Sequence, residues 1–208
     1  MNILHITSSS RGGASYSNRV AAQVIGEISA RNPGTSVTVR DVARDPLPHI
    51  DDDFVIATRS PGGPQTERQR ALLAQSDALV DELFAADVIV IAAPMINFTI
   101  PSTLKSWVDY VARAGRTFRY SEKGPEGLVT GKQVILVAAR GGVYAENAAL
   151  DFQVPYLKSV LGFLGMTDVE VIEVEGTAFG PEAAEKAVEG ATAKLHTQCD
   201  RREAAAAA

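Results

Sequence analysis

The chain alternates five short strand-like runs with longer segments of helical periodicity, and this alternation limits the fold more than any other feature of the sequence. The strand-like runs cover residues 2–7, 36–41, 87–93, 133–139 and 168–175. The helical segments cover residues 17–31, 65–86, 101–114, 151–164 and 181–197. Strands that alternate with helices form right-handed crossover units, so the pattern predicts a parallel sheet with helices on both faces.

The hydrophobic pattern inside each run predicts the order of the strands. The runs "VIVIAA" and "VILVAA" are continuously apolar, as in strands covered on both faces, whereas "SVTVRD" and "DVEVIEVE" alternate, as near a sheet edge. The second and fifth strands therefore belong at the edges, in agreement with the order 2-1-3-4-5, whereas the six-stranded dinucleotide-binding order needs one more strand. We expect an α/β, flavodoxin-like three-layer sandwich with a five-stranded parallel sheet. Residues 1–200 are expected to form a single domain, followed by a low-complexity tail at residues 201–208.

The composition narrows the classes of partner and compartment. A formal net charge of −5 and a sequence pI near 5.3 give little attraction to nucleic acid or to an anionic membrane. The longest apolar stretch is too short to cross a bilayer, and the first residues lack a signal-peptide pattern, so we expect a cytoplasmic protein. No spacing of cysteine and histidine residues indicates a metal site.

Two stretches lack clear periodicity. Residues 45–64 are rich in proline and contain an acidic triplet. This composition predicts a solvated surface loop rather than a cation site, because adjacent carboxylates in one loop rarely all face one ion. Residues 115–131 are expected to form a long loop, of the kind that serves as a lid or a binding loop.

The loop "SSSRGGASYS" after the first strand has the character of an anion site. It leads into a helix whose first N–H groups are free to donate, and Ser9, Ser15 and Ser17 add hydroxyl donors. The loop matches neither G-x-G-x-x-G nor G-x-x-x-x-G-K-[ST], so a monophosphate fits it better than a dinucleotide or a nucleoside triphosphate. The alternative interpretation is an ordinary capped helix start.

Two further loops are expected to meet the first one, because the carboxyl ends of parallel strands share one edge of the sheet. The loop "PMINFTIP" places Asn97 and Phe98 between two prolines, which suits a flat heteroaromatic ring. The loop of Arg140, Gly141 and Gly142 permits close backbone approach and offers a positive charge. No nucleophile elbow, zinc-binding helix or pair of carboxylates is visible, so a cofactor is expected to carry the reaction. Flavin mononucleotide (FMN) matches each loop.

A resemblance to a known family supports this hypothesis. The stretch "APMINFTIPSTLKSWVDYVARAGRTFRYSEKGPEGLVTGK", the later "ARGG" and the "LGFLG" before the last strand resemble the FMN-dependent NADH azoreductases, also described as NADH:quinone oxidoreductases. The resemblance covers nearly the whole chain. It implies that Ser9, Ser15, Tyr16 and Ser17 hold the FMN phosphate. It also implies that the flavin ring contacts Met95, Ile96, Asn97, Phe98, Ala139, Arg140, Gly141 and Gly142.

The same resemblance implies a homodimer with an active site at each subunit boundary, where Tyr120 and Phe163 form a substrate-stacking surface. Two positions depart from the family, which often has tyrosine where this chain has Ile96 and serine where it has Ala139. We expect an altered FMN affinity or substrate preference from these changes, because backbone donors do not depend on the side chain.

The implied activity is a two-electron transfer from NADH or NADPH, through hydride transfer to FMN, to quinones and to aromatic azo compounds, in a ping-pong sequence. No metal is expected. The sequence leaves open two other classes, a flavodoxin-type electron carrier and a ligand-binding protein without turnover. It also leaves open the choice between NADH and NADPH, for which Arg59, Arg116 and Arg119 are candidate contacts to a 2′-phosphate.

Overall fold

A computed structural model describes residues 1–144 and 148–206, with side chains described as far as residue 193. The strands are β1 (Asn2–Thr7), β2 (Ser36–Asp41), β3 (Val88–Pro94), β4 (Phe118–Ser121), β5 (Gly124–Gly127), β6 (Gln133–Ala139) and β7 (Asp168–Val174). The α-helices are α1 (Tyr16–Arg31), α2 (Asp52–Arg59), α3 (Glu67–Ala85), α4 (Ser102–Val111), α5 (Val154–Leu164) and α6 (Pro181–Ala206). Short 3-10 helices span Gly12–Ala14 and Ala148–Leu150.

The main sheet is parallel and has five strands in the order β2-β1-β3-β6-β7. The flavodoxin-like α/β architecture is confirmed, and the sheet uses the runs that the sequence singled out. The predicted numbering 2-1-3-4-5 is not confirmed, because the connection between β3 and β6 contains two further strands that lie outside this sheet.

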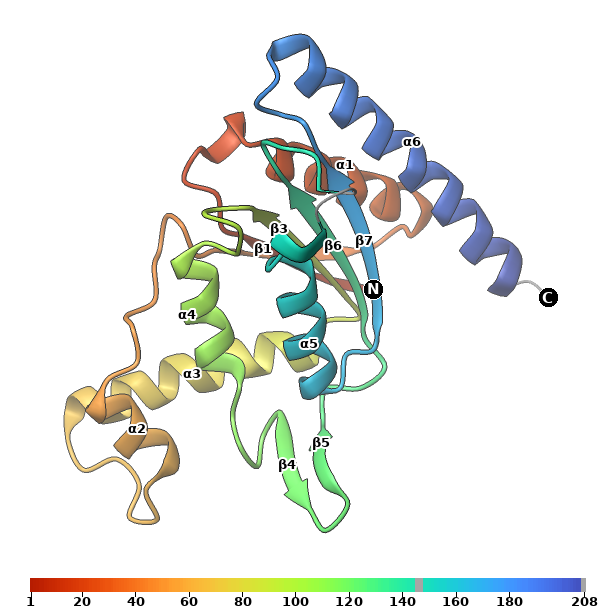
Figure 1. Cartoon of the computed structure of the whole chain (residues 1–208). Helices are drawn as coiled ribbons and strands as arrows, with labels where there is room; N and C mark the ends of the chain where they lie inside the picture. The colour runs from red at the N-terminus through yellow and green to blue at the C-terminus, as the bar shows by residue number, and fades with distance from the viewer. Residues whose placement is uncertain (145–147, 207–208) are drawn as a thin grey trace.

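These two strands correct the prediction of a long loop at residues 115–131. β4 and β5 form an antiparallel hairpin, which Figure 1 shows at the end of the sheet opposite the strand arrowheads. The hairpin is fixed to the end of α5, where the N–H of Val129 donates to the carbonyl of Leu164 at 2.9 Å. A Cβ atom at Gly127 would lie 2.1 Å from the backbone nitrogen of Gly165, so only glycine permits this contact.

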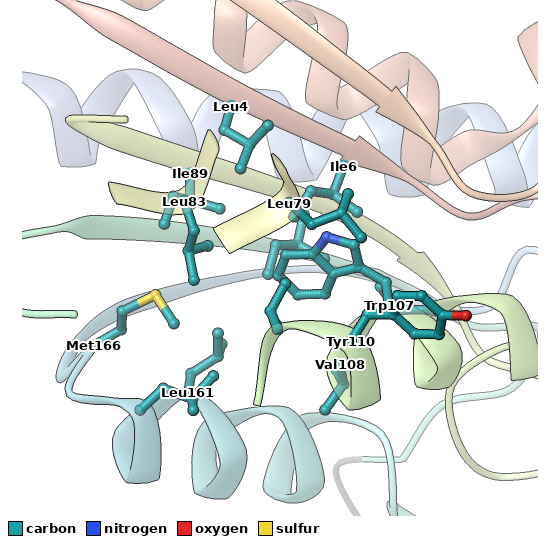
Figure 2. Packing of buried hydrophobic residues seen from close by; sticks show 14 of the residues in the cluster. Leu4, Ile6, Leu79, Leu83, Ile89, Trp107, Val108, Tyr110, Leu161 and Met166 are labelled. Carbon is teal, nitrogen blue, oxygen red and sulfur yellow. The ribbon is translucent and has the colours of Figure 1, made fainter. Parts of the chain in front are cut away.

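Helices cover both faces of the sheet, as predicted. Figure 1 shows α1 and α6 on one face and α3, α4 and α5 on the other. Figure 2 shows the indole of Trp107 in the hydrophobic core between the sheet and helices α3, α4 and α5, among Ile6, Leu79 and Tyr110. Trp107 is 1% exposed and therefore contributes to the hydrophobic core.

Residues 45–64 are also more ordered than predicted, because they contain α2. Asp51 caps this helix, since its carboxylate accepts the N–H of Phe54 at 3.0 Å, and Asp52 and Asp53 occupy the first turn. Carboxylates at a helix N-terminus interact favourably with the helix dipole, which explains the acidic triplet without a cation. Among the described residues, no group of three His, Cys, Asp or Glu side chains has the arrangement of a metal site. No described helix has both the length and the apolar character of a membrane span.

Candidate cofactor site

The three predicted loops meet at the carboxyl ends of β1, β3 and β6, where they line a cleft of about 430 Å³. Of the predicted site residues, this cleft brings together Ser9, Ser15, Tyr16, Met95, Ile96, Ala139, Arg140 and Gly141. The remaining lining residues are Ser8, Ser10, Arg11, Ala43, Pro94, Pro101, Ser102, Thr103 and Thr177. The site therefore lies where parallel α/β sheets place their ligands.

The first loop supplies a cluster of hydrogen-bond donors. Ser15 is the N-cap of α1, and its hydroxyl accepts the N–H of Asn18 at 3.4 Å. The N–H groups of Tyr16 and Ser17 belong to the first helical turn and have no acceptor among the described residues. Ser9 accepts the N–H of Arg11 at 3.3 Å through its hydroxyl oxygen, so its own hydrogen remains free to donate.

Ser17 lies behind this cluster rather than in it. Its side chain is fully buried and does not line the cleft, and its hydroxyl lies 3.0 Å from that of Ser15. A hydrogen bond from Ser17 to Ser15 leaves the Ser15 hydrogen free to point into the cleft. Of the three predicted serines, Ser9 and Ser15 therefore line the cleft, and Ser17 contacts Ser15 from behind.

The second loop turns sharply after β3. The N–H of Ile96 donates to the carbonyl of Thr99 at 2.8 Å, and the N–H of Thr99 donates back at 3.1 Å. The two residues between them, Asn97 and Phe98, have φ angles of 47° and 71°. Left-handed conformations cost about 1–3 kcal/mol at residues other than glycine, and such strain is concentrated at functional sites.

This turn divides the four predicted ring contacts into two pairs. Met95 and Ile96 line the cleft, whereas Asn97 and Phe98 do not. Phe98 is 48% exposed. Beyond the turn, α4 begins at Ser102, so the free N–H groups of its first turn also point toward the cleft. A polar pair directly after Pro101 is the signal in the sequence that would have identified Ser102 and Thr103.

The third loop corrects the role expected of the Arg140 charge. The Arg140 side chain is 2% exposed and pairs with Asp151 at 2.8 Å, with Glu175 at 3.0 Å and with Glu173 at 3.3 Å. Its backbone N–H donates to the carbonyl of Val174 at 2.8 Å. The guanidinium group is therefore bound by protein carboxylates and is not free to offset the charge of a ligand.

The glycines of this loop keep the backbone close to the cleft. Gly141 lines it, and its N–H has no acceptor among the described residues. A Cβ atom at Gly141 would lie 3.2 Å from the Cβ of Ala178, which is tighter than ordinary van der Waals contact. Gly142 does not line the cleft, and its carbonyl accepts the N–H of Gly176 at 3.0 Å.

The two predicted substrate residues lie elsewhere in the subunit. Tyr120 is on the hairpin and Phe163 is near the end of α5, and neither lines the cleft. Phe118 joins them, because its ring centroid lies 5.6 Å from that of Tyr120 and 4.6 Å from that of Phe163. Tyr120 is 75% exposed, whereas Phe118 beneath it is 9% exposed.

A larger hollow of about 740 Å³ adjoins the cleft on the other side of the Ser9 loop. Two of its polar side chains are bonded within the protein, whereas the buried Nε2 of His5 has no hydrogen-bond partner among the described residues. Asn18 accepts the hydroxyl of Thr7 at 2.9 Å and donates to the carbonyl of Gly12 at 3.0 Å. The Asp41 carboxylate accepts hydrogen bonds from the N–H groups of Ala43 and Arg44, so it caps a turn rather than facing a ribose. The smaller cleft, with its free donors, is therefore the better candidate site.

Comparisons with known proteins agree with this architecture. A family model described as a flavodoxin-like fold matches residues 1–199. The chain is 50% identical over 210 residues to the FMN-dependent NADH:quinone oxidoreductase of Mesorhizobium japonicum, and the match covers 100% of both chains. It is 54% identical over 196 residues to the protein of the same name from Agrobacterium fabrum, covering 93% of this chain and 96% of that one.

A solved structure is similar as well. The azoreductase from Bacillus anthracis str. Sterne superposes with a TM-score of 0.87 at 29% identity, covering 97% of this chain and 99% of that one. Fold and site together define a flavodoxin-like α/β protein with a ligand cleft at the carboxyl ends of its strands. The chain belongs to the family of FMN-dependent NADH:quinone oxidoreductases, and the resemblance expected from the sequence is confirmed.

Proposed function

We propose that this protein is an FMN-dependent oxidoreductase that transfers two electrons from NADH or NADPH to quinones and reductively cleaves aromatic azo compounds. The observation that carries the proposal is the cleft itself, whose lining combines free hydroxyl and N–H donors with apolar side chains. The names of the relatives support the same chemistry.

The residues of the cleft fit FMN. The hydroxyls of Ser9 and Ser15 and the N–H groups at the start of α1 form a donor set for a terminal phosphate. Met95 and Ile96 offer an apolar surface for a flat ring, and the free N–H of Gly141 offers a donor to its polar edge. Ile96 and Ala139 line the cleft, so we propose that their side chains influence FMN affinity and substrate choice.

FMN supplies the hydride-accepting chemistry when it is bound. The described lining of the cleft contains no histidine, cysteine, lysine or carboxylate, so no side chain there is a candidate acid or base near neutral pH. The contribution of the protein is to bind, to orient and to place N–H donors where negative charge develops. We propose that the nicotinamide and the electron acceptor occupy the cleft in turn, which is a ping-pong sequence. Steady-state kinetics at varied NADH and quinone concentrations test this, because a ping-pong sequence gives parallel reciprocal plots and a ternary complex gives intersecting ones.

The structure does not favour two of the three arginines considered for nicotinamide preference. Arg116 pairs with Asp77 at 3.1 Å and with Asp81 at 2.8 Å. Arg119 pairs with Glu126 at 2.7 Å. Both are thus engaged by carboxylates, and Arg59 is exposed at the end of α2. We propose NADH as the preferred donor, in keeping with the names of the relatives. The ratio of kcat/KM for NADH and NADPH tests this preference.

We propose that the functional unit is a homodimer. Its support is a set of exposed apolar side chains on the connections that follow β3, β6 and β7, namely Ile96, Phe98, Val143, Leu150, Phe152 and Phe179. The exposed Tyr120 contacts Phe118, which in turn contacts Phe163, and its outer face suits a stacking surface offered to the site of a second subunit. Sedimentation equilibrium tests the dimer directly. We further propose a cytoplasmic location and a single FMN-binding domain at residues 1–200.

A further inference from the structure

A short segment that no sequence motif singled out holds the walls of the cleft together. Residues 151–153, which we call the 151–153 bridge, lie immediately before α5. Gln153 is fully buried although it is polar, and a buried amide is stable only when its hydrogen-bonding groups are satisfied. Its partners come from two different walls of the cleft.

The Gln153 side chain joins β3 to the Arg140 loop. Its Nε2 donates to the carbonyl of Ala93 at 2.9 Å, two residues before the strained second loop begins. Its Oε1 accepts the Nε–H of Arg140 at 3.1 Å. The ends of β3 and β6 are already paired as neighbouring strands, and the Gln153 amide adds a link from this paired edge to the buried guanidinium group of Arg140.

The rest of the 151–153 bridge acts on the same two walls. The Asp151 carboxylate accepts a hydrogen bond from Nη2 of Arg140 at 2.8 Å. It also accepts hydrogen bonds from the N–H groups of Gln153 at 2.9 Å and Val154 at 3.1 Å. The N–H of Phe152 donates to the carbonyl of Phe98 at 3.0 Å, and the hydroxyl of Thr99 donates to the carbonyl of Phe152 at 3.2 Å. These two bonds hold the turn that contains both left-handed residues.

We propose that Gln153 is a positioning residue of the cofactor cleft, which it controls by fixing the end of β3 and the buried Arg140 relative to each other. The inference rests on the proposed FMN function for its consequence, but the geometric link exists in the free protein. Gln153 itself does not line the cleft. It acts through the backbone of the second loop and through the loop of Arg140 and Gly141.

The first test measures the walls without any cofactor. Hydrogen exchange of the free protein is followed in peptides that cover residues 95–99 and 140–142, for wild type and for Gln153→Leu. The matched control is Gln69→Leu, since Gln69 is equally polar and only 5% exposed, but bonds to Asp53, Gln65 and Thr66 far from the cleft. We expect exchange in both peptides to rise about tenfold in Gln153→Leu, which corresponds to about 1.4 kcal/mol, and to remain unchanged in Gln69→Leu.

A second variant separates the two bonds. Gln153→Glu keeps an acceptor for Arg140 but loses the donor to the carbonyl of Ala93. We expect faster exchange in the 95–99 peptide and little change in the 140–142 peptide. Circular dichroism confirms that each variant is folded before exchange is compared.

The second measurement is FMN affinity, followed by quenching of flavin fluorescence. We expect Kd to rise about tenfold in Gln153→Leu and to stay within about twofold of wild type in Gln69→Leu. Unchanged exchange in both wall peptides of Gln153→Leu overturns the proposal, and so does raised exchange with an unchanged Kd. Wild-type protein that binds no FMN refutes the proposed function instead, and the exchange comparison then decides the geometric link alone.

Discussion

Adjacent serines at the end of β1 offer the sharpest test of the phosphate cradle. Ser8 and Ser9 both line the cleft, but only one of the two hydroxyl groups has a hydrogen that is free to bond a ligand. The Ser8 hydroxyl donates to the buried carbonyl of Ala92 at 3.0 Å, so its hydrogen is already used. The Ser9 hydroxyl accepts the N–H of Arg11 and keeps its hydrogen free. Ser9→Ala should therefore weaken FMN binding, and Ser8→Ala should not.

The expected magnitude follows from the charge of the acceptor. A hydrogen bond to a charged group contributes about 1.5–3 kcal/mol, and about 1.4 kcal/mol corresponds to a tenfold change in Kd. Ser9→Ala should thus raise the Kd for FMN by about 10- to 150-fold. Ser8→Ala removes a neutral, buried hydrogen bond and should lower the free energy of unfolding of the cofactor-free protein by about 1 kcal/mol.

Two measurements on each variant decide the outcome. Quenching of flavin fluorescence gives Kd, and urea denaturation of the cofactor-free protein gives the free energy of unfolding. The reasoning is refuted if Ser8→Ala weakens FMN binding as much as Ser9→Ala does, because the difference between a used and a free hydroxyl would then have no effect. Unchanged affinity in Ser9→Ala would mean that backbone N–H groups hold the phosphate alone.

Three further predictions follow from burial and exposure. Trp107→Ala should lower the free energy of unfolding by about 3–5 kcal/mol, since the indole is 1% exposed in the core; a loss below about 1 kcal/mol in urea denaturation would contradict this packing. Burial lowers the pKa of His5 in the folded chain below 6.5, against an opposing effect of Asp41, so the unfolded chain binds more protons and stability should fall as the pH drops below about 6.5. His5→Gln should reduce that slope in urea midpoints measured between about pH 5 and 8, and an unaltered slope would count against a buried neutral imidazole. Tyr120→Ala should raise KM for a quinone while leaving the Kd for FMN and the unfolding free energy nearly unchanged, because this side chain is 75% exposed; an unaffected KM would remove Tyr120 from the substrate surface.

The main sheet was predictable because its central and edge strands differ in their pattern of apolar residues. The central strands β3 and β6 are continuously apolar and are buried on both faces, and the edge strand β2 alternates and is largely exposed. The hairpin was not predictable from pattern, since "GPEG" has two glycines and a proline, which usually mark a turn. Helix α2 was missed for a similar reason, because prolines on both sides concealed eight residues with an N-terminal cap.

The position of the site was predictable, whereas the state of its side chains was not. Parallel strands bring their carboxyl ends to one edge, so loops after β1, β3 and β6 had to meet. The burial of Arg140 depends on carboxylates from two other elements, at Asp151 and at Glu173 and Glu175, which no local pattern connects. The left-handed turn at Asn97 and Phe98 is likewise set by its bonds to Phe152, which is distant in the sequence.

The most direct test of the central claim is an anaerobic titration of the purified protein followed by its visible spectrum. We predict that the protein takes up FMN in a one-to-one ratio with the chain, that NADH bleaches the flavin absorbance, and that a quinone added afterwards restores it without any partner protein. Protein that acquires no flavin spectrum with excess FMN, or bound flavin that NADH does not bleach, would contradict the account.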